Sequence, residues 1–209
     1  MKFKLKLLSG VCIALCLSAC STSPTGRNQI TMFSGDKMSA MGSESFEQMK
    51  KDIPISSDKK LTAYVQCVAD QITPNVSKEA HDGSWEVVLF ESDQINAFAL
   101  PGGKIGVYTG ILKVTENQDQ LAAIMGHEVG HVIANHSNER LSSNSVAQGA
   151  LQISGVLLSG QDEQTQGLVM AGLGVGVQYG VLMPYGRTHE KEADIIGQEL
   201  MAKSGFKPK

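Results

Sequence analysis

Residues 127–131 read His-Glu-Val-Gly-His, and these residue types at this spacing could carry out hydrolysis at a metal ion. On a helix, His127 and His131 are one turn apart, so both imidazoles leave the same face and can bind one Zn²⁺ ion. Glu128 lies beside them and could accept a proton from a water molecule at the metal without being a ligand itself. The alternative is a helix with two surface histidines, and the surrounding sequence has to decide between the two interpretations.

The residues on either side of this motif predict a buried helix. Its start can be capped by Thr115 with Gln118, or by Asn117 with Gln120, in the pattern of a capping box. Apolar residues then recur at the spacing of a helix face that packs on a core; they are Leu121, Met125, Val129 and Val132.

Three residues in and after this helix need their own explanations. Gly126 and Gly130 each lower helix stability by about 1 kcal/mol relative to alanine, and the close approach of another backbone would explain them. His136 lies five positions after His131. A third histidine ligand of the metzincin type lies six positions on, so we interpret His136 as a surface histidine.

A third ligand is expected from a second helix, predicted over residues 188–201. Glu190 and Asp194 are one turn apart, with Glu190 in the first turn, so they share a face. Glu190 could complete the metal site, and Asp194 could hydrogen-bond a ligand histidine and fix its tautomer. Glu192 points about 200° away from Glu190, so we expect its loss to matter little. If Glu190 and Asp194 stood alone, we would interpret them as part of a run of charged, solvent-exposed residues. The motif at residues 127–131 favours the metal site instead.

With these two motifs the chain resembles the zinc metallopeptidases typified by HtpX and the CAAX prenyl endopeptidases, and most of all their periplasmic BepA/LoiP-like lipoprotein branch. Residues 96–110 and 192–206 also resemble segments of that family. The resemblance implies that His127, His131 and Glu190 bind one Zn²⁺ ion per chain, that Glu128 is the catalytic base, and that Asp194 supports the catalytic site. It also implies an α+β fold: a mainly helical, zincin-type metallopeptidase domain with a small sheet or hairpin beside the helix of the first motif.

A hairpin is predicted over residues 95–109, with its turn at residues 101–103. The resemblance implies that the outer strand of this hairpin pairs with the substrate backbone, which makes Asn96, Ala97 and Phe98 candidate substrate-binding residues. Ordinary packing of a hairpin is the alternative. The family continues beyond the third-ligand helix, and we expect that part to be missing from this sequence. Tyr185, Arg187 and His189 are then candidates for stabilising the oxyanion.

The N-terminus predicts a bacterial lipoprotein. Three lysines followed by a short apolar run make residues 1–19 a signal peptide, because a spanning helix would need about 20 apolar residues. Residues 17–20 read Leu-Ser-Ala-Cys and resemble a lipobox, so Cys20 would carry the lipid, and residues 20–30 would form a lipidated, flexible tether. Ordinary cleavage with Cys20 as a bystander is the alternative. Residues 31–209 form the predicted metallopeptidase domain.

Charge and cysteine content exclude several other classes of protein. Without the three signal lysines, 15 of the 18 basic residues remain against 21 acidic residues, so nucleic acid is not an expected partner. Cys67 would be the one cysteine left in the mature domain, so no internal disulfide is possible. It borders the apolar stripe of a helix predicted over residues 58–76, and we expect a buried, unreactive thiol.

The remaining elements are a helix over residues 34–51, a half-buried strand over residues 85–90 and a glycine-rich, apolar region over residues 146–186. The longest apolar stretch of this last region is short for a membrane span. We expect core helices that pack closely through small residues. A lid or a membrane-facing loop over the catalytic site is the alternative.

Together these features predict a zinc-dependent metalloendopeptidase that is attached to the outer membrane and faces the periplasm. By resemblance, its substrates are misfolded or misassembled envelope proteins, and the outer-membrane assembly machinery is a candidate partner. The alternative is a protease-like lipoprotein that acts mainly as a chaperone or assembly factor, with little or no hydrolysis.

Overall fold

The computed structural model describes residues 20–160, 162–177 and 183–208, so the predicted signal peptide lies outside the described residues. The chain divides into two compact units. We call Ser34–Ser137 with Arg187–Lys209 the sheet unit, and Asn138–Gly186 with the residues up to Phe33 the long-helix unit. Among the described residues, no helix is both long and apolar enough to cross a membrane.

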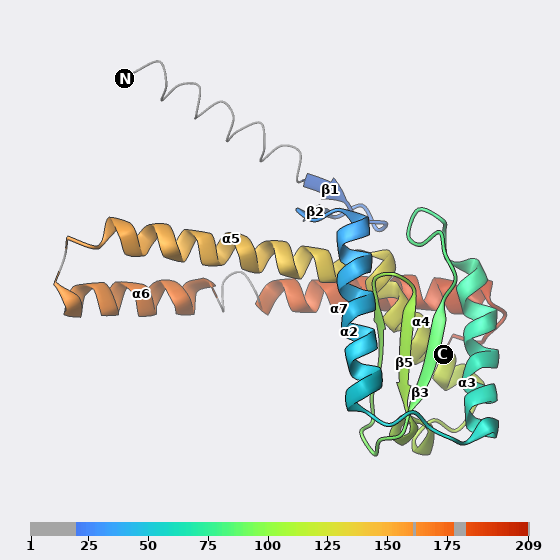
Figure 1. Cartoon of the computed structure of the whole chain (residues 1–209). Coiled ribbons are helices and arrows are strands. Elements are labelled where there is room, and N and C mark those ends of the chain that lie inside the picture. Colours follow the sequence, from blue (N-terminus) through green and yellow to red (C-terminus); the bar gives the residue numbers. More distant parts are fainter. Residues whose placement is uncertain (1–19, 161, 178–182, 209) are drawn as a thin grey trace. The chain divides into compact units, whose positions relative to one another are not determined.

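The sheet unit is built around three strands in the order β3-β5-β4 (Figure 1). Strand β3 (Glu86–Phe90) runs parallel to β5 (Lys104–Tyr108), and β4 (Ala97–Leu100) runs antiparallel to it. The short turn between β4 and β5 confirms the predicted hairpin. Because β5 lies in the middle, β4 is an edge strand.

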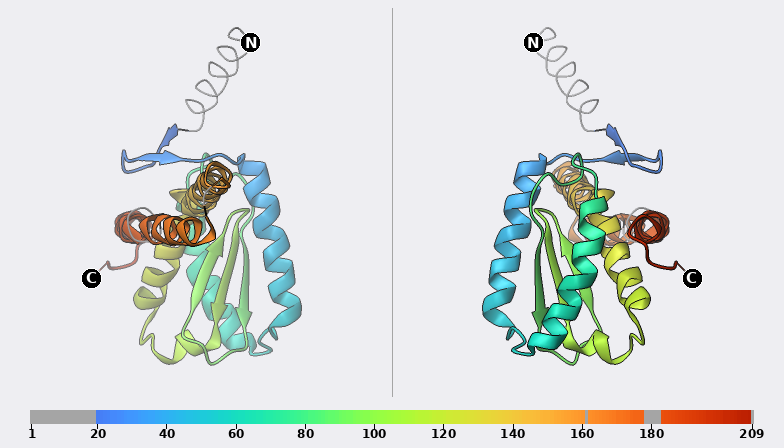
Figure 2. Two further views of the ribbon diagram at one scale, coloured as in Figure 1. Left: turned by 90° about the vertical axis from the view of Figure 1, so that its left-hand side faces the viewer. Right: turned by 90° about the vertical axis from the view of Figure 1, so that its right-hand side faces the viewer.

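Helices cover both faces of this sheet (Figure 2). Helix α2 (Gly35–Asp52) lies against one face, and α3 (Lys59–Ile72) and α4 (Gln118–Ile133) lie against the other. Two short 3-10 helices, η1 (Thr73–Asn75) and η2 (Thr109–Lys113), follow α3 and β5.

Successive side chains of a strand point to opposite faces of the sheet, so the buried side chains of the strands belong to two hydrophobic clusters, one on each face. On β3, for example, Leu89 belongs to the core shared with α3 and α4, whereas Phe90 packs with Phe46 of α2. The sequence predicts a half-buried strand over residues 85–90. In the structure, helices cover both faces of this strand.

Helix α3 confirms the predicted apolar stripe but corrects the prediction for Cys67. Val65, Val68 and Ile72 are buried, whereas the thiol of Cys67 is exposed. Cys67 lies two positions after Val65, which turns it about 200° away from that buried residue.

The long-helix unit contains a small hairpin, β1 (Cys20–Thr22) with β2 (Asn28–Ile30), and two helices. These are α5 (His136–Leu157), whose first two residues belong to the sheet unit, and α6 (Glu163–Val177). Arg27, between the two strands, forms two hydrogen bonds of 2.7 Å with the buried carboxylate of Glu139. The segment predicted as a flexible tether is therefore folded as a hairpin and held by an ion pair. The side chain of Cys20 lies outside the described residues.

The prediction of closely packed core helices is wrong for the described part of residues 146–186, which leaves out residues 161 and 178–182. A methyl group added at Gly149, Gly155, Gly167 or Gly172 would meet no atom within 4 Å. Several large apolar side chains on these helices are exposed instead; they include Val146, Ile153, Val156, Leu157 and Leu168.

Candidate metal centre

Helix α4 presents the first motif as the sequence predicts. Of the two predicted caps, Asn117 is the one used: its side chain accepts a hydrogen bond from the backbone N–H of Gln120. The predicted apolar stripe is buried in the core of the sheet unit. His127 and His131 lie one turn apart and are half-buried.

A second helix passes very close to α4. This helix, α7 (Met183–Lys203), contributes residues from Arg187 onward to the sheet unit. A Cβ atom added at Gly130 would lie 2.8 Å from the backbone oxygen of Ala193, and one added at Gly126 would lie 3.1 Å from that of Gly197. This confirms that the two glycines of α4 allow another backbone to approach.

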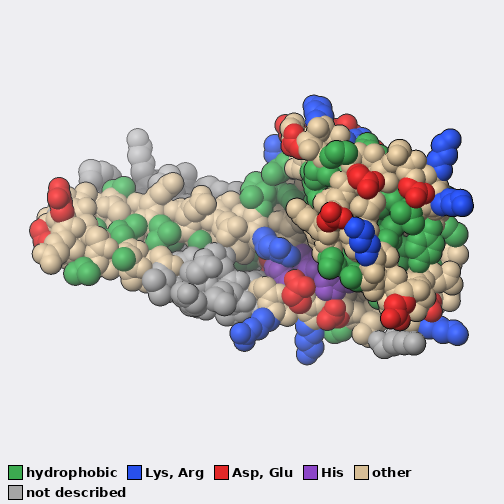
Figure 3. Space-filling model, turned by 90° about the horizontal axis from the view of Figure 1, so that it is seen from below, with side chains coloured by type: hydrophobic (Ala, Val, Ile, Leu, Met, Phe, Trp, Pro, Cys, Tyr) green, Lys and Arg blue, Asp and Glu red, His purple; other side chains and the backbone are tan. Residues whose placement is uncertain are grey.

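The close crossing brings three possible metal ligands together, namely His127, His131 and Glu190, with one donor atom from each within 4.8 Å of the others. The two Nε2 atoms of His127 and His131 are 3.1 Å apart. The carboxylate of Glu190 lies 3.3 Å from Nε2 of His127 and 3.7 Å from Nε2 of His131. Figure 3 shows histidine side chains at the molecular surface with acidic side chains beside them.

These separations fit a tetrahedral metal ion. Ligand atoms about 2.0–2.1 Å from such an ion lie about 3.3 Å from one another. Two imidazole nitrogens and one carboxylate oxygen are also a donor set that catalytic Zn²⁺ sites use, with a fourth position left for water or substrate. The residues present therefore fit the metal that the sequence predicts.

Asp194 holds the first of the two histidines, as the spacing on α7 predicts. One of its carboxylate oxygens lies 2.8 Å from Nδ1 of His127, which leaves Nε2 of that ring directed toward His131 and Glu190. One detail of the prediction is wrong: α7 begins at Met183, so Glu190 is not in its first turn.

His136 corrects the sequence-based interpretation most clearly. It is fully buried rather than on the surface, and its Nδ1 lies 2.8 Å from Nδ1 of His131. Its Nε2 lies 3.1 Å from a carboxylate oxygen of Glu192, which is 2% exposed. Burial lowers the pKa of His136 to about 4, and the hydrogen bond with Glu192 opposes this shift only in part, so the ring is neutral at neutral pH.

Glu192 is therefore more enclosed than its spacing on α7 suggests. It is not one of the three clustered donors. However, its side chain is buried and hydrogen-bonded, and removing it would leave His136 without this acceptor. The spacing alone could not reveal this, because the partner of Glu192 lies 56 positions earlier in the chain.

The other predicted residues differ in how deeply they are buried. Glu128 is half-buried on α4, in the turn that joins the two histidines. His189, a candidate for stabilising the oxyanion, is buried and stacks on His136 with ring centres 4.1 Å apart. It is therefore not placed to meet a substrate. Arg187 is exposed, and the side chain of Tyr185 lies outside the described residues.

Strand β4 carries two of the three predicted substrate-binding residues, Ala97 and Phe98, with Asn96 directly before it, and it lies next to α4. The backbone oxygen of Asn96 accepts a hydrogen bond from the N–H of Tyr108 on β5. Because the groups of an antiparallel strand alternate between its two edges, Phe98 also faces β5, whereas the main-chain groups of Ala97 and Ala99 face the open edge.

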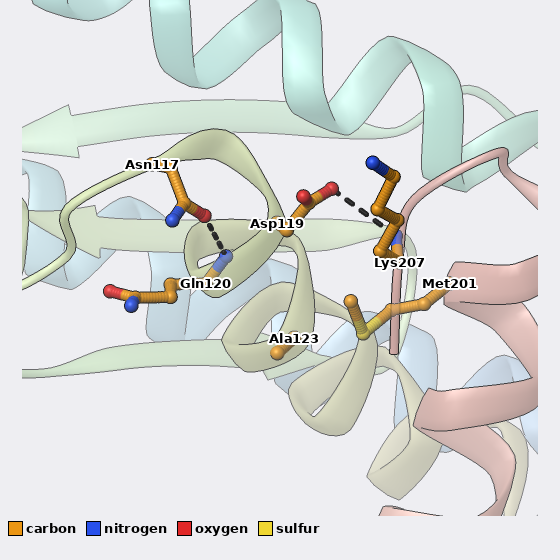
Figure 4. A pocket seen from close by; sticks show the side chains of 6 residues that line it. All are labelled: Asn117, Asp119, Gln120, Ala123, Met201 and Lys207. Carbon is orange, nitrogen blue, oxygen red and sulfur yellow. Dashed lines mark hydrogen bonds between the residues drawn. The ribbon is translucent and has the colours of Figure 1, made fainter. Parts of the chain in front are cut away.

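Two small pockets lie along the groove between α4 and α7. One, of about 120 Å³, is lined by His127, Asp194 and Gly197 among others. The second, of about 240 Å³, shares Ala123 and Met201 with the first and is also lined by Asn117 and Gln120 (Figure 4). Asp119 closes one side of it by accepting a hydrogen bond from the backbone N–H of Lys207.

Comparison with known proteins agrees with this geometry. A beta-barrel assembly-enhancing protease of Yersinia pestis is 27% identical over 176 residues, which are 83% of this chain and 36% of that protein. The mitochondrial metalloendopeptidase OMA1 of Schizosaccharomyces pombe is 33% identical over 127 residues, which are 61% of this chain and 35% of that protein. OMA1 of Arabidopsis thaliana is 37% identical over 128 residues, which are 60% of this chain and 24% of that protein.

The chain thus spans about a third or less of the length of these relatives. Residues 59–209, which include both motifs and the hairpin, match the sequence pattern of peptidase family M48. The chain therefore belongs to peptidase family M48, a family of metalloendopeptidases.

Proposed function

We propose that the chain is a zinc metalloendopeptidase in which His127, His131 and Glu190 hold the metal and Glu128 is the general base. The observation that carries this proposal is the separation of the three donor groups, 3.1 Å to 3.7 Å, which matches the spacing around a tetrahedral ion.

The chemistry follows from the position of each side chain. A zinc ion at this site would polarise the scissile carbonyl and lower the pKa of a nearby water molecule. Glu128 accepts the proton of the attacking water and then donates it to the leaving amine, so that it ends the cycle ionised. Asp194 keeps the ring of His127 oriented through the hydrogen bond to Nδ1.

The substrate binds as an extended strand along β4. This edge strand lies next to α4, and its outward main-chain groups belong to Ala97 and Ala99. Main-chain hydrogen bonds of this kind give affinity with little preference for sequence. They also require an unfolded segment, which suits misfolded or misassembled envelope proteins as substrates. The name of the Yersinia pestis relative, an enhancer of β-barrel assembly, is consistent with this substrate class and with the outer-membrane assembly machinery as a partner.

We expect the purified zinc-loaded protein to cleave casein, which is unfolded, and to leave folded ribonuclease A intact. Removing the metal with a chelator should abolish cleavage, and adding back about one equivalent of Zn²⁺ should restore it. Gel electrophoresis of time points measures this result. The chaperone alternative makes the opposite prediction: the protein suppresses aggregation of an unfolded client equally well with and without metal, and it leaves casein uncut.

We also propose that the protein is a lipoprotein of the outer membrane, anchored through Cys20 and facing the periplasm. Cys20→Ser in the full-length chain, expressed in a Gram-negative bacterium, should prevent lipid attachment. The variant should then fractionate as a soluble periplasmic protein or as an inner-membrane precursor, whereas Ser21→Ala should fractionate like the unsubstituted protein. Membrane fractionation with immunoblotting measures the difference. Recovery of the Cys20 variant in the outer membrane would rule out the acyl anchor.

A further inference from the structure

The chain turns just after the His-Glu-Val-Gly-His motif, and this turn places His136 beside His131. Helix α4 ends at Ile133, and Asn135 adopts a left-handed backbone conformation with φ of 57°. Asparagine tolerates this region better than most residues. In a continuous helix His136 would point about 140° away from His131, so the contact between the two rings depends on this turn.

A line of hydrogen bonds then runs from the metal centre into the protein interior. Nδ1 of His131 lies 2.8 Å from Nδ1 of His136, and Nε2 of His136 lies 3.1 Å from the carboxylate of Glu192. On the other side of His131, Nε2 faces His127 and Glu190. His131 thus uses one ring nitrogen toward the metal centre and the other toward His136.

Packing leaves the middle of this line little room to move. His136 is fully buried, Glu192 is 2% exposed, and the ring of His189 stacks on His136 at an interplanar angle of 18°. Glu192 also lies on α7, the helix that provides Glu190 and Asp194. One helix therefore supplies a proposed metal ligand and the carboxylates that contact both histidines. The contact is direct for His127 and passes through His136 for His131.

The positions of the protons follow from the partners. Of two ring nitrogens that share a hydrogen bond, one donates and the other accepts, as for the two Nδ1 atoms of His131 and His136. Nε2 of His131 can bind a metal only with a lone pair, which puts the proton of His131 on Nδ1, so Nδ1 of His131 is the donor and Nδ1 of His136 the acceptor. The proton of His136 then lies on Nε2, where a carboxylate oxygen of Glu192 accepts it.

We propose that His136 and Glu192 are positioning residues that fix His131 in the tautomer with its proton on Nδ1, so that Nε2 can bind the metal. This inference rests on the proposed function, since it assigns a purpose to the pair at that same metal site. It extends the known arrangement at His127, where Asp194 contacts Nδ1 directly.

The tautomers can be measured in the unsubstituted, metal-free protein at neutral pH. Two-bond ¹H–¹⁵N correlation spectra of histidine rings distinguish a proton on Nδ1 from one on Nε2. We expect His131 to carry its proton on Nδ1 and His136 to carry its proton on Nε2. A spectrum with the proton of His131 on Nε2 would overturn the proposal, and this measurement does not depend on whether any variant folds.

Two substitutions of Glu192 test the consequence for metal binding. Glu192→Leu removes the acceptor, so His136 is free to place its proton on Nδ1 and drive that of His131 to Nε2. We expect the zinc dissociation constant to rise by about 10–100-fold, as for other lost partners of metal ligands, together with the change of tautomer. Glu192→Gln should keep both the zinc affinity and the tautomer of the unsubstituted protein, because its amide oxygen can accept the same hydrogen bond.

Glu199→Leu is the matched control, because Glu199 lies on the same helix but is exposed and paired with Lys203. It should change neither the tautomer nor zinc affinity. If Glu192→Leu keeps the tautomer of His131 and binds zinc as tightly as the control, the proposal is wrong. A failure of the proposed function looks different: the unsubstituted protein would then bind no zinc, or would bind it and cleave nothing, whatever the tautomer of His131.

Discussion

Glu128→Gln should retain one zinc ion per chain and lose peptide hydrolysis. Glutamine keeps the size of the side chain but cannot accept the proton of the attacking water, and general acid–base catalysis of this kind contributes about 10²–10⁴-fold to the rate. The loss should appear in kcat for cleavage of a peptide derived from casein. It should leave zinc content unchanged, because Glu128 is not one of the three clustered donors.

Glu199→Gln provides the comparison for this experiment, because it makes the same chemical change at an exposed ion pair on α7. Its activity should equal that of the unsubstituted protein. If the Glu128 variant keeps most of its activity under the same conditions, another group accepts the proton and the assignment of the base is wrong.

Glu190→Ala should lose both zinc and activity, because it removes one of the three donor groups and leaves only two imidazoles. Asp194→Ala should have a smaller effect: its partner His127 remains, but the hydrogen bond to Nδ1 is lost, so zinc affinity should fall by about 10–100-fold. Competition with a chelator of known affinity measures both constants. Equal losses in the two variants would contradict the distinction between a ligand and a residue that orients one.

The parts of the site that the sequence predicts lie within single helices. His127, His131 and the buried stripe of α4 follow from the helical repeat, and so does the shared face of Glu190 and Asp194. The glycines at 126 and 130 also predict the close approach of another backbone, which is that of α7.

The parts that the sequence could not predict depend on how the chain turns. His136 reaches His131 because the left-handed conformation of Asn135 turns the chain, and its second partner comes from a distant helix. A spacing rule that assumes one continuous helix therefore places His136 on the surface. The signal that could have revealed the turn is Asn135 itself, since asparagine is a frequent residue where a helix ends in a left-handed conformation.

The helices α5 and α6 show a second reason why the sequence alone does not predict part of the structure. Their apolar residues and glycines resemble a buried pair of helices, yet many of the apolar side chains are exposed. Composition shows that a segment is apolar, but it does not show which surface, if any, covers it.

Zinc content of three purified proteins tests the central claim most directly. Elemental analysis after dialysis against metal-free buffer should give about one zinc ion per chain for the unsubstituted protein and for Glu128→Gln, and almost none for Glu190→Ala. This pattern would identify a site in which Glu190 binds the metal and Glu128 does not. Full zinc content in the Glu190 variant, or its loss in the Glu128 variant, would contradict the account.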